Sequence, residues 1–406
     1  MTPHPSRPVL AVGAWLKNTA CRLDAAGPHW SAVHGDLRDA DACRALEASA
    51  RDLSSQSRQP IAAIAHDLHP DFYSTRLALA LAEEWQVKAI GVQHHHAHIG
   101  AVMAEHGLNE PVIGLALDGV GLGTDGTAWG GELLWVDPTG WERLGHLWPL
   151  ALPGGDVAAR EPWRMLASAL HAMGRGTEIE PRLSPVVGAG PARIIQRMLE
   201  TQLNCPISTS AGRWFDAAAA ALGLHLLQQK EAEAAVALEQ QAALRIDSLA
   251  HADARVAGYE DIATDASVLD IRPLLATLLE WPRAADTVPA AAAWFHLALA
   301  HALADWAAHA ARQAQCRAVC LGGGCFMNAI LAEQLTRRLQ GLGMRVYRPL
   351  RNSCGDAGLA LGQAWVVAQQ LRVSAVGGSN VAFSVIASEA RQAKPSWISA
   401  PLRSSQ

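Results

Sequence analysis

The chain has 406 residues, of which half are hydrophobic, and it carries a formal net charge of −5 at pH 7. A chain of this length can bury a large core, so we expect an ordinary folded protein of two to three domains. Positive charge is neither in excess nor clustered, which argues against a nucleic-acid partner but not against a small nucleotide.

The amino-terminal segment lacks the basic stretch, the apolar stretch and the small-residue cleavage site of a secretory leader. No uncharged run approaches the roughly 18 apolar residues of a membrane span. We therefore predict a cytoplasmic protein with no membrane partner. The seven cysteines form no CxxC pair, and their odd number favours reduced thiols over a disulfide framework.

An apolar run followed by a glycine-rich turn occurs three times along the chain. Residues 8–12 lead to Gly13, residues 112–118 lead to a loop with four glycines, and residues 318–321 lead to three glycines and a helical pattern. A further strand is expected at 61–66. This repetition indicates an α/β architecture with sites at the ends of the strands.

The middle of the chain, from about residue 155 to 311, is rich in alanine and leucine and is expected to be a helical insertion. Its helices are expected at 163–173, 216–229, 231–245 and 290–315. Another helix is expected just after Asp356 and should run to about residue 370. Beyond it the periodicity is lost, so we expect residues 371–406 to form a loosely ordered tail.

Glycine-rich loops can bind phosphate because backbone N–H groups approach anionic oxygens closely where no Cβ intervenes. None of the three loops is followed by the Gly-Lys-Ser/Thr of a Walker P-loop, and the loop after Asp118 does not match GxGxxG. A plain tight turn explains any one of them as well as a phosphate site does. Three such loops in one α/β chain favour nucleotide binding.

Four histidines occur within the five positions from His94 to His98. His94 and His98 stand four residues apart, which places both imidazoles on one face of a helix, where they can bind one metal ion. A single histidine on an apolar face is more often a hydrogen-bonded core residue, but burying four without partners would be costly. The spacing matches the HExxH of metalloproteases, yet His95 occupies the position of the general-base glutamate.

Two aspartates lie at turns that could bring them to these histidines. Asp118 follows a buried-type strand, and Asp356 precedes a helix, where an aspartate is also typical as a structural cap. Two histidines and two carboxylates would form a mixed nitrogen and oxygen site that suits zinc or iron. The sequence does not choose between those metals.

The chain resembles the HypF carbamoyltransferases of [NiFe]-hydrogenase maturation, in their C-terminal Kae1-like domain. The resemblance spans roughly residues 7–370 and rests on strings that occur in order: GAWLKNT, HDLHPDFYSTRLA, VQHHHAHIGAVMAEHG, ALDGVGLGTDGTAWGGE, ALPGGDVAAREPWRML, GRWFDAAAAALG, GGGCFMNAILAEQL and GDAGLALGQA. The antibiotic O-carbamoyltransferases are also similar, and the tRNA threonylcarbamoyladenosine transferase is more distantly so.

The resemblance implies an ASKHA fold, in which two actin-like α/β lobes enclose a cleft. We expect the first lobe at residues 1–110 and the second at 111–370, with the helical insertion inside the second lobe. The family pattern assigns the metal ligands to His94, His98, Asp118 and Asp356. It assigns adenylate binding to Gly119, Gly323, Gly324 and Asn328, places Gly212 and Asp216 near the ribose, and puts Arg160 where a lysine commonly stands near the reacting group.

The reaction implied by the resemblance transfers a carbamoyl group from carbamoyl adenylate to the C-terminal cysteine thiol of the partner HypE. It needs a divalent metal, zinc or iron, and an adenine nucleotide, but no nucleophile from this chain, so no catalytic side chain is assigned. A truncated, non-catalytic paralogue that binds nucleotide or HypE is the alternative. Threonylcarbamoyl transfer to tRNA fits the fold but not the HypF-like strings or the charge.

Three departures from the family pattern qualify these expectations. Full-length members begin with an acylphosphatase domain, zinc fingers and a YrdC-like domain that makes carbamoyl adenylate, and this sequence matches only the Kae1-like part. We therefore expect no reaction from carbamoyl phosphate and ATP unless another polypeptide, such as a YrdC-domain protein, supplies the adenylate. Ala357 replaces a second glycine after the metal aspartate, and Cys325 and Met327 depart from the pattern in the third glycine loop.

Overall fold

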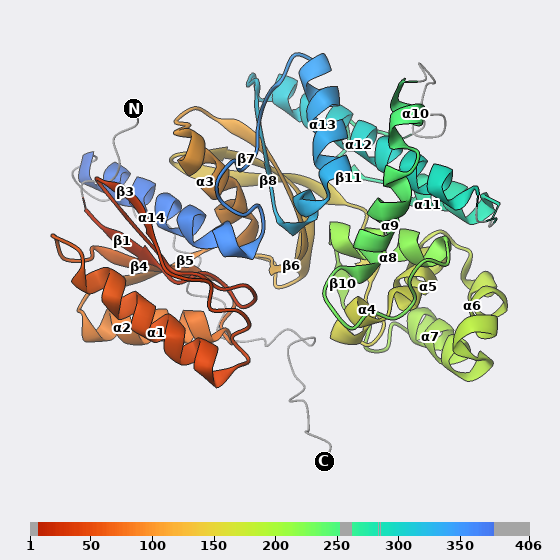
Figure 1. The fold of residues 1–406 in the computed structure, drawn as a ribbon, viewed down its shortest axis with the longest axis horizontal. Coiled ribbons are helices and arrows are strands. Elements are labelled where there is room, and N and C mark those ends of the chain that lie inside the picture. The colour runs from red at the N-terminus through yellow and green to blue at the C-terminus, as the bar shows by residue number, and fades with distance from the viewer. Residues whose placement is uncertain (1–6, 252–261, 283, 285, 377–406) are drawn as a thin grey trace.

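The computed structural model describes residues 7–251, 262–282, 284 and 286–376 (Figure 1). Two β-sheets with helices around them form the body of the protein, and a group of helices extends from the second sheet. This arrangement confirms the predicted α/β class.

The first sheet has the strand order β3-β2-β1-β4-β5. β1 pairs antiparallel with β2 and parallel with β4, so the sheet is mixed. Helices α1 and α2 cover one face, where Leu46 and Leu81 pack with Leu10 and Ile64 of the strands. The elements are β1 (Val9–Ala11), β2 (Cys21–Asp24), β3 (Gly27–Trp30), α1 (Ala40–Ser55), β4 (Ala63–Asp67), α2 (Tyr73–Glu84) and β5 (Lys88–Val92).

The core of the second sheet repeats this topology, with the order β8-β7-β6-β12-β13 and the same sequence of antiparallel and parallel pairings. These strands are β6 (Val112–Leu122), β7 (Ala128–Asp137), β8 (Gly140–Leu147), β12 (Ala318–Gly322) and β13 (Arg345–Tyr347), and the short strands β9 (Leu150–Ala151), β10 (Ile207–Ser208) and β11 (Val268–Leu269) extend the sheet. A duplicated mixed sheet is the signature of the two-lobed ASKHA fold, which was predicted.

Two helices exchange places between the halves. Helix α3 (His94–His106) follows the last strand of the first sheet but packs on β6 and β12, whereas α14 (Leu359–Val376) follows the last strand of the second sheet but packs on β1, β2 and β4 (Figure 1). The two helices also pack against each other, with Gly100 and Gly362 at the contact. A Cβ atom at Gly362 would lie 1.7 Å from the carbonyl oxygen of Ala97, so only glycine permits this approach.

Helix α14 also corrects the expectation for the carboxyl-terminal tail. The helix continues to Val376, so residues 371–376 are helical, because Leu371 still packs on the core that α3 and α14 share. The rest of that segment, 377–406, lies outside the described residues. The division of the chain at residue 110 stays a prediction. Helix α14 packs on the first sheet, although most of its residues fall in the range 111–370 that was expected to form the second lobe.

The helix-rich segment packs as one hydrophobic core with the second sheet. Its helices are α4 (Asp156–Arg160), α5 (Pro162–Ala172), α6 (Ile179–Val187), α7 (Ala189–Thr201), α8 (Ala211–Ala221), α9 (Glu233–Ala243), α10 (Ile246–His251), α11 (Arg272–Glu280) and α12 (Val288–Gln313), and α13 (Ala329–Gly341) follows β12. The helix expected at 216–229 is displaced to 211–221. It starts at the Ser210 cap, which accepts a hydrogen bond from the Arg213 N–H, and the chain leaves it at Gly223, where φ is +69°.

No helix in the described ranges is both long and apolar enough to cross a lipid bilayer. All seven cysteines lie within these ranges and none forms a disulfide, as the sequence predicted.

Candidate functional site

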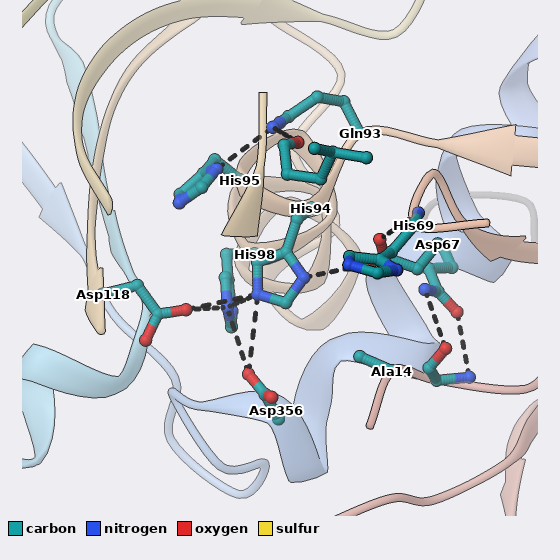
Figure 2. A network of polar contacts seen from close by, with 12 residues as sticks. Ala14, Asp67, His69, Gln93, His94, His95, His98, Asp118 and Asp356 are labelled. Atoms are coloured by element: carbon teal, nitrogen blue, oxygen red, sulfur yellow. Dashed lines mark hydrogen bonds and ion pairs between the residues drawn. The ribbon is translucent and has the colours of Figure 1, made fainter. Parts of the chain in front are cut away.

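The two histidines and two aspartates that were predicted as metal ligands come together between the two halves (Figure 2). His94 and His98 project from the first turns of α3, Asp118 from strand β6, and Asp356 from the short 3-10 turn that precedes α14. Their four ligand atoms all lie within 4.8 Å of one another. Each ligand comes from a segment adjacent to the α3 and α14 crossing, so the exchange of helices builds the site.

The spacing of these atoms fits a divalent metal. The two Nε2 atoms of the histidines are 3.2 Å apart, and Oδ2 of Asp118 lies 3.2 Å and 3.1 Å from them. Oδ1 of Asp356 lies at 3.6 Å and 3.7 Å. Ligand bonds of about 2.0–2.1 Å in a tetrahedral arrangement place neighbouring donors about 3.3 Å apart. The donor set suits zinc and iron alike, because both accept imidazole and carboxylate ligands.

A β-bulge positions Asp118. The register of β6 against β7 shifts between Leu117 and Gly121, so strand β6 continues to Leu122. The expectation that the strand ends at Asp118 is therefore wrong. The bulge lets pairing resume beyond the aspartate while its carboxylate is turned out of the ladder. Burial raises the pKa of Asp118, but His94 and His98 outweigh that effect and hold it well below its usual range.

Asp67 is a candidate site residue that the sequence did not reveal. It ends strand β4, is fully buried, and accepts the Nδ1–H of His94 at 2.7 Å and the backbone N–H of His69 at 2.9 Å (Figure 2). A carboxylate on Nδ1 fixes the imidazole tautomer and leaves the Nε2 lone pair for a metal. In the sequence, the one feature that could have pointed to Asp67 is its position at the end of a buried strand, within the segment HDLHPDF.

The electrostatics of His94 follow from these neighbours. Burial alone would lower the pKa of the imidazole, but the carboxylates of Asp67, Asp118 and Asp356 raise it well above its ordinary value. A proton and a metal cation therefore compete for Nε2 of His94.

The other two histidines of the run are not ligands. Nδ1 of His95 accepts a hydrogen bond from the Gln93 amide at 3.0 Å, and His96 packs near the ring of Trp141. Burial is the main cause that holds the pKa of His95 well below its ordinary value and lowers that of His96 to about 3, so both are neutral. His95 therefore does not replace the general-base glutamate of a metalloprotease, as the sequence indicated.

The predicted glycines Gly119, Gly212, Gly323 and Gly324 gather around Asp118. The N–H groups of Gly119 and Gly324 donate to Oδ1 of Asp118 at 2.7 Å and 3.2 Å. A Cβ atom at Gly212 would lie 3.2 Å from the Cα of Gly119, and one at Gly323, whose φ is +105°, would lie 2.3 Å from the carbonyl oxygen of Leu117. The absence of side chains at these glycines therefore lets several backbone segments pack closely around the Asp118 carboxylate.

Asn328 has partners within the protein. Its Oδ1 accepts the Leu331 N–H at the start of α13, and its Nδ2 lies 2.9 Å from Nε2 of His296. Glu239 accepts a further N–H from this helix end, that of Ala329, at 2.7 Å. The backbone N–H groups of Ala329 and Leu331 at the amino terminus of α13 thus already have acceptors. The nucleotide-binding role of Asn328 stays a prediction, and it requires that Asn328 give up these protein partners for the nucleotide.

Asp216 and Arg160 lie apart from the cluster in different ways. Asp216 is buried on α8, with Oδ2 2.8 Å from Nε of Arg213 in an ion pair, and burial raises its pKa. Arg160 ends α4 with an exposed side chain that contacts no polar group in the described part of the chain. The structure therefore places Gly212 and Asp216 on one helix but does not bring Arg160 to the metal ligands.

Comparisons with known proteins agree with this geometry. The family model described as Carbamoyltransferase, Kae1-like Domain, second subdomain matches residues 114–363, and the HypF Kae1-like domain model matches residues 4–105. A protein of Cupriavidus necator named Carbamoyltransferase HypF homolog is 57% identical over 365 residues, which are 89% of this chain and 92% of that protein. Carbamoyltransferase HypF2 of the same organism is 47% identical over 89% of this chain but only 46% of its own length.

Solved HypF structures show the same fold. A crystal structure of full-length HypF in a phosphate- and nucleotide-bound form has a TM-score of 0.80 at 30% identity and covers 91% of this chain and 47% of its own. HypF of T. kodakarensis has a TM-score of 0.81 at 29% identity. The chain thus spans nearly all of the shorter relative and about half of the longer HypF proteins. It belongs to the HypF carbamoyltransferase family, through the Kae1-like part of that family.

Proposed function

We propose that this chain transfers a carbamoyl group from carbamoyl adenylate to the C-terminal cysteine thiol of a HypE-like acceptor protein. The thiocarbamate would serve the synthesis of the cyanide ligand in [NiFe]-hydrogenase maturation, in the cytoplasm. The observation that carries the proposal is the convergence of His94, His98, Asp118 and Asp356 beside the glycine-rich turns around Asp118 in a HypF-family chain. Metal ligands beside a phosphate-compatible backbone suit a reaction in which an acyl phosphate bond is broken.

The transfer requires positioning rather than a nucleophile from this chain. The acceptor sulfur forms a bond to the carbonyl carbon, the bond from that carbon to the phosphate oxygen breaks, and AMP leaves with the electron pair. A divalent zinc or iron ion held by the four ligands would supply Lewis-acid polarisation of the carbonyl group. Asp67 holds His94 in the tautomer that such a site needs, and Gly119, where a Cβ atom would meet nothing within 4 Å, leaves room for the adenylate.

The proposal is tested by direct transfer. The purified chain would be mixed with carbamoyl adenylate and with a HypE-like acceptor that ends in cysteine. The adenylate would be made freshly by a YrdC-domain protein from ATP and carbamate, which an acylphosphatase releases from carbamoyl phosphate. Intact-mass measurement should show one carbamoyl group on the acceptor, and none on an acceptor whose last residue is serine. Metal and AMP binding without any transfer would contradict the proposal and support the non-catalytic binding protein.

The supply of the adenylate is a separate question with its own measurement. The same mixture without the YrdC-domain protein should give no transfer from carbamoyl phosphate and ATP. Transfer in its absence would show that this chain makes the adenylate itself, and the proposed need for a supplying partner would be wrong.

A further inference from the structure

The loop between β1 and β2 carries a lysine in an unusual backbone conformation. Lys17 has a φ of +47°, in the left-handed region that residues with a Cβ rarely adopt. The neighbouring Asn18 holds the loop in place, because its Nδ2 donates to the carbonyl oxygens of Val12 at 2.8 Å and Ala14 at 2.9 Å. A backbone held this firmly in a strained region is typical of a functional position.

This loop is attached directly to the segment that carries Asp356. The N–H of Gly13 donates to Oε1 of Gln363 at 3.0 Å, and the Gln363 amide donates back to the Gly13 carbonyl at 3.3 Å. At the other end of the loop, the Thr19 hydroxyl donates to the carbonyl of Ala357 at 2.9 Å. Lys17 is therefore fixed beside a metal ligand from the other half of the molecule.

The ammonium group of Lys17 faces acidic groups from three other segments. Its Nζ lies 2.9 Å from Oε2 of Glu231, which precedes α9, and both side chains are about half exposed. Burial lowers the pKa of Lys17, but Glu231, Asp356 and Asp118 outweigh it and raise the pKa, so the side chain is charged. An exposed ion pair contributes little to stability. Lys17 can therefore exchange Glu231 for another anion at low cost.

The histidines near the metal cluster do not offer an accessible base. His94 and His98 point their Nε2 atoms at the metal position, and His95 and His96 are buried within α3. His69 is also buried and stacks on the Phe72 ring, with centroids 4.1 Å apart. A thiol that reaches the site therefore finds no accessible histidine base, so loss of its proton to solvent is favoured when its thiolate is stabilised.

We propose that Lys17 is a catalytic residue whose ammonium group leaves Glu231 and stabilises the thiolate of the acceptor cysteine next to the carbonyl carbon. This inference rests on the proposed transfer to a thiol. The thiol proton goes to water, the sulfur forms the new bond to carbon, and AMP leaves with the electrons of the broken carbon–oxygen bond. A neighbouring lysine is one of the groups known to favour the thiolate form of cysteine.

The test compares Lys17→Met and Lys17→Arg with the wild-type protein. Methionine keeps a long side chain and the same backbone strain, so it isolates the charge, and arginine retains the charge. The rate constant kcat for transfer would be measured from pH 6 to pH 9.5 with saturating carbamoyl adenylate and a saturating HypE-like acceptor, because kcat reports the pKa of the thiol in the bound complex. We expect Lys17→Met to be about tenfold slower at pH 7, with its acidic limb about one pH unit higher and recovery at high pH, while Lys17→Arg follows the wild type.

Two further measurements make the outcome specific. AMP binding, measured by calorimetry, should be unchanged in Lys17→Met, and Glu231→Gln should transfer at least as fast as wild type at pH 7. An unmoved pH profile overturns the proposal, and weakened AMP binding with an unmoved profile would show that Lys17 contacts the nucleotide phosphate instead. A wild-type protein that transfers no carbamoyl group would refute the proposed function itself, and the role of Lys17 with it.

Discussion

The starts of α3 and α14 are equivalent in the duplicated topology, yet they contribute to the metal cluster in different ways. At α3, His94 and His98 are buried, and Asp67 fixes one of them through a 2.7 Å hydrogen bond. At α14, Asp356 stands farther from both imidazoles, at 3.6 Å and 3.7 Å, and its side chain is 23% exposed. The two histidines at α3 are thus held by buried partners, whereas Asp356 at α14 lies on the more exposed side of the cluster.

The difference indicates where substrates enter. The buried side of the cluster, toward α3 and β4, is closed by packed side chains. The Asp356 side adjoins the Lys17 loop through Thr19 and Gln363. We infer that the α3 half supplies the rigid part of the site and that reactants enter from the α14 side, and the following changes test this difference.

The largest effect is expected from His98→Ala, which removes a ligand from the rigid half. Loss of a neighbour that only orients a ligand typically costs 10–100-fold in metal affinity, so loss of the ligand itself should cost more than about 100-fold. Transfer activity should fall with it. Zinc and iron binding, measured by metal analysis after dialysis, would test this.

His106→Ala is the matched control, because His106 is the last residue of the same helix and its ring contacts the carbonyl of Arg348 and the Tyr347 ring, away from the cluster. It should bind metal as the wild type does. Full metal content in His98→Ala would exclude His98 as a ligand.

Gly362→Ala should break the crossing of the two helices. The added methyl group would meet the Ala97 carbonyl oxygen at 1.7 Å and the Ala101 nitrogen at 2.7 Å, so α3 and α14 must separate. Overpacking of this kind typically lowers the free energy of unfolding by about 1–3 kcal/mol, and we expect the upper end of that range. Urea unfolding measures it, with Gly341→Ala as the control in α13, where a Cβ meets open space. Equal stability of the two variants would contradict the close contact.

The part of the site that the sequence could predict is the part that local spacing determines. The four-residue separation of His94 and His98 places them on one helical face in any context, and the family pattern added Asp118 and Asp356. The partnership of Asp67 with His94 depends instead on the parallel pairing of β4 and β5, which sets residues 27 positions apart side by side. The bulge at Asp118 and the exchange of α3 and α14 likewise arise from tertiary packing, which periodicity does not encode.

Asp67→Asn tests how far the α3 half depends on its buried carboxylate. The variant keeps the shape but loses the charge that holds the Nδ1–H of His94, so metal affinity should fall about 10–100-fold. Competition with a fluorescent zinc chelator would measure the change. Asp71→Asn removes a nearby exposed carboxylate and should leave the affinity unchanged. Unaltered affinity in Asp67→Asn would mean that packing alone orients His94.

The last prediction is a pH dependence of metal binding that extends above the usual histidine range. Burial lowers the pKa of His94, but its three carboxylate neighbours raise it well above the ordinary value. In protein stripped of metal by a chelator, the protonated imidazole therefore stabilises the fold below the unfolded-state pKa of about 6.5. That stabilisation is lost as the pH rises through the folded-state pKa.

The metal must displace this proton, so its own stabilising effect changes in the opposite direction. Apparent zinc affinity should rise by about tenfold for each pH unit until His94 is deprotonated in the free protein. The zinc-dependent increase in Tm, measured at pH 6, 7 and 8, should therefore grow with pH. Asp67→Asn removes the carboxylate that raises the pKa of His94 most. In this variant the zinc-dependent increase in Tm should therefore stop growing at a lower pH than in the wild type. A wild-type zinc effect that is constant from pH 6 to 8 would show that the carboxylates around α3 do not hold a proton on His94.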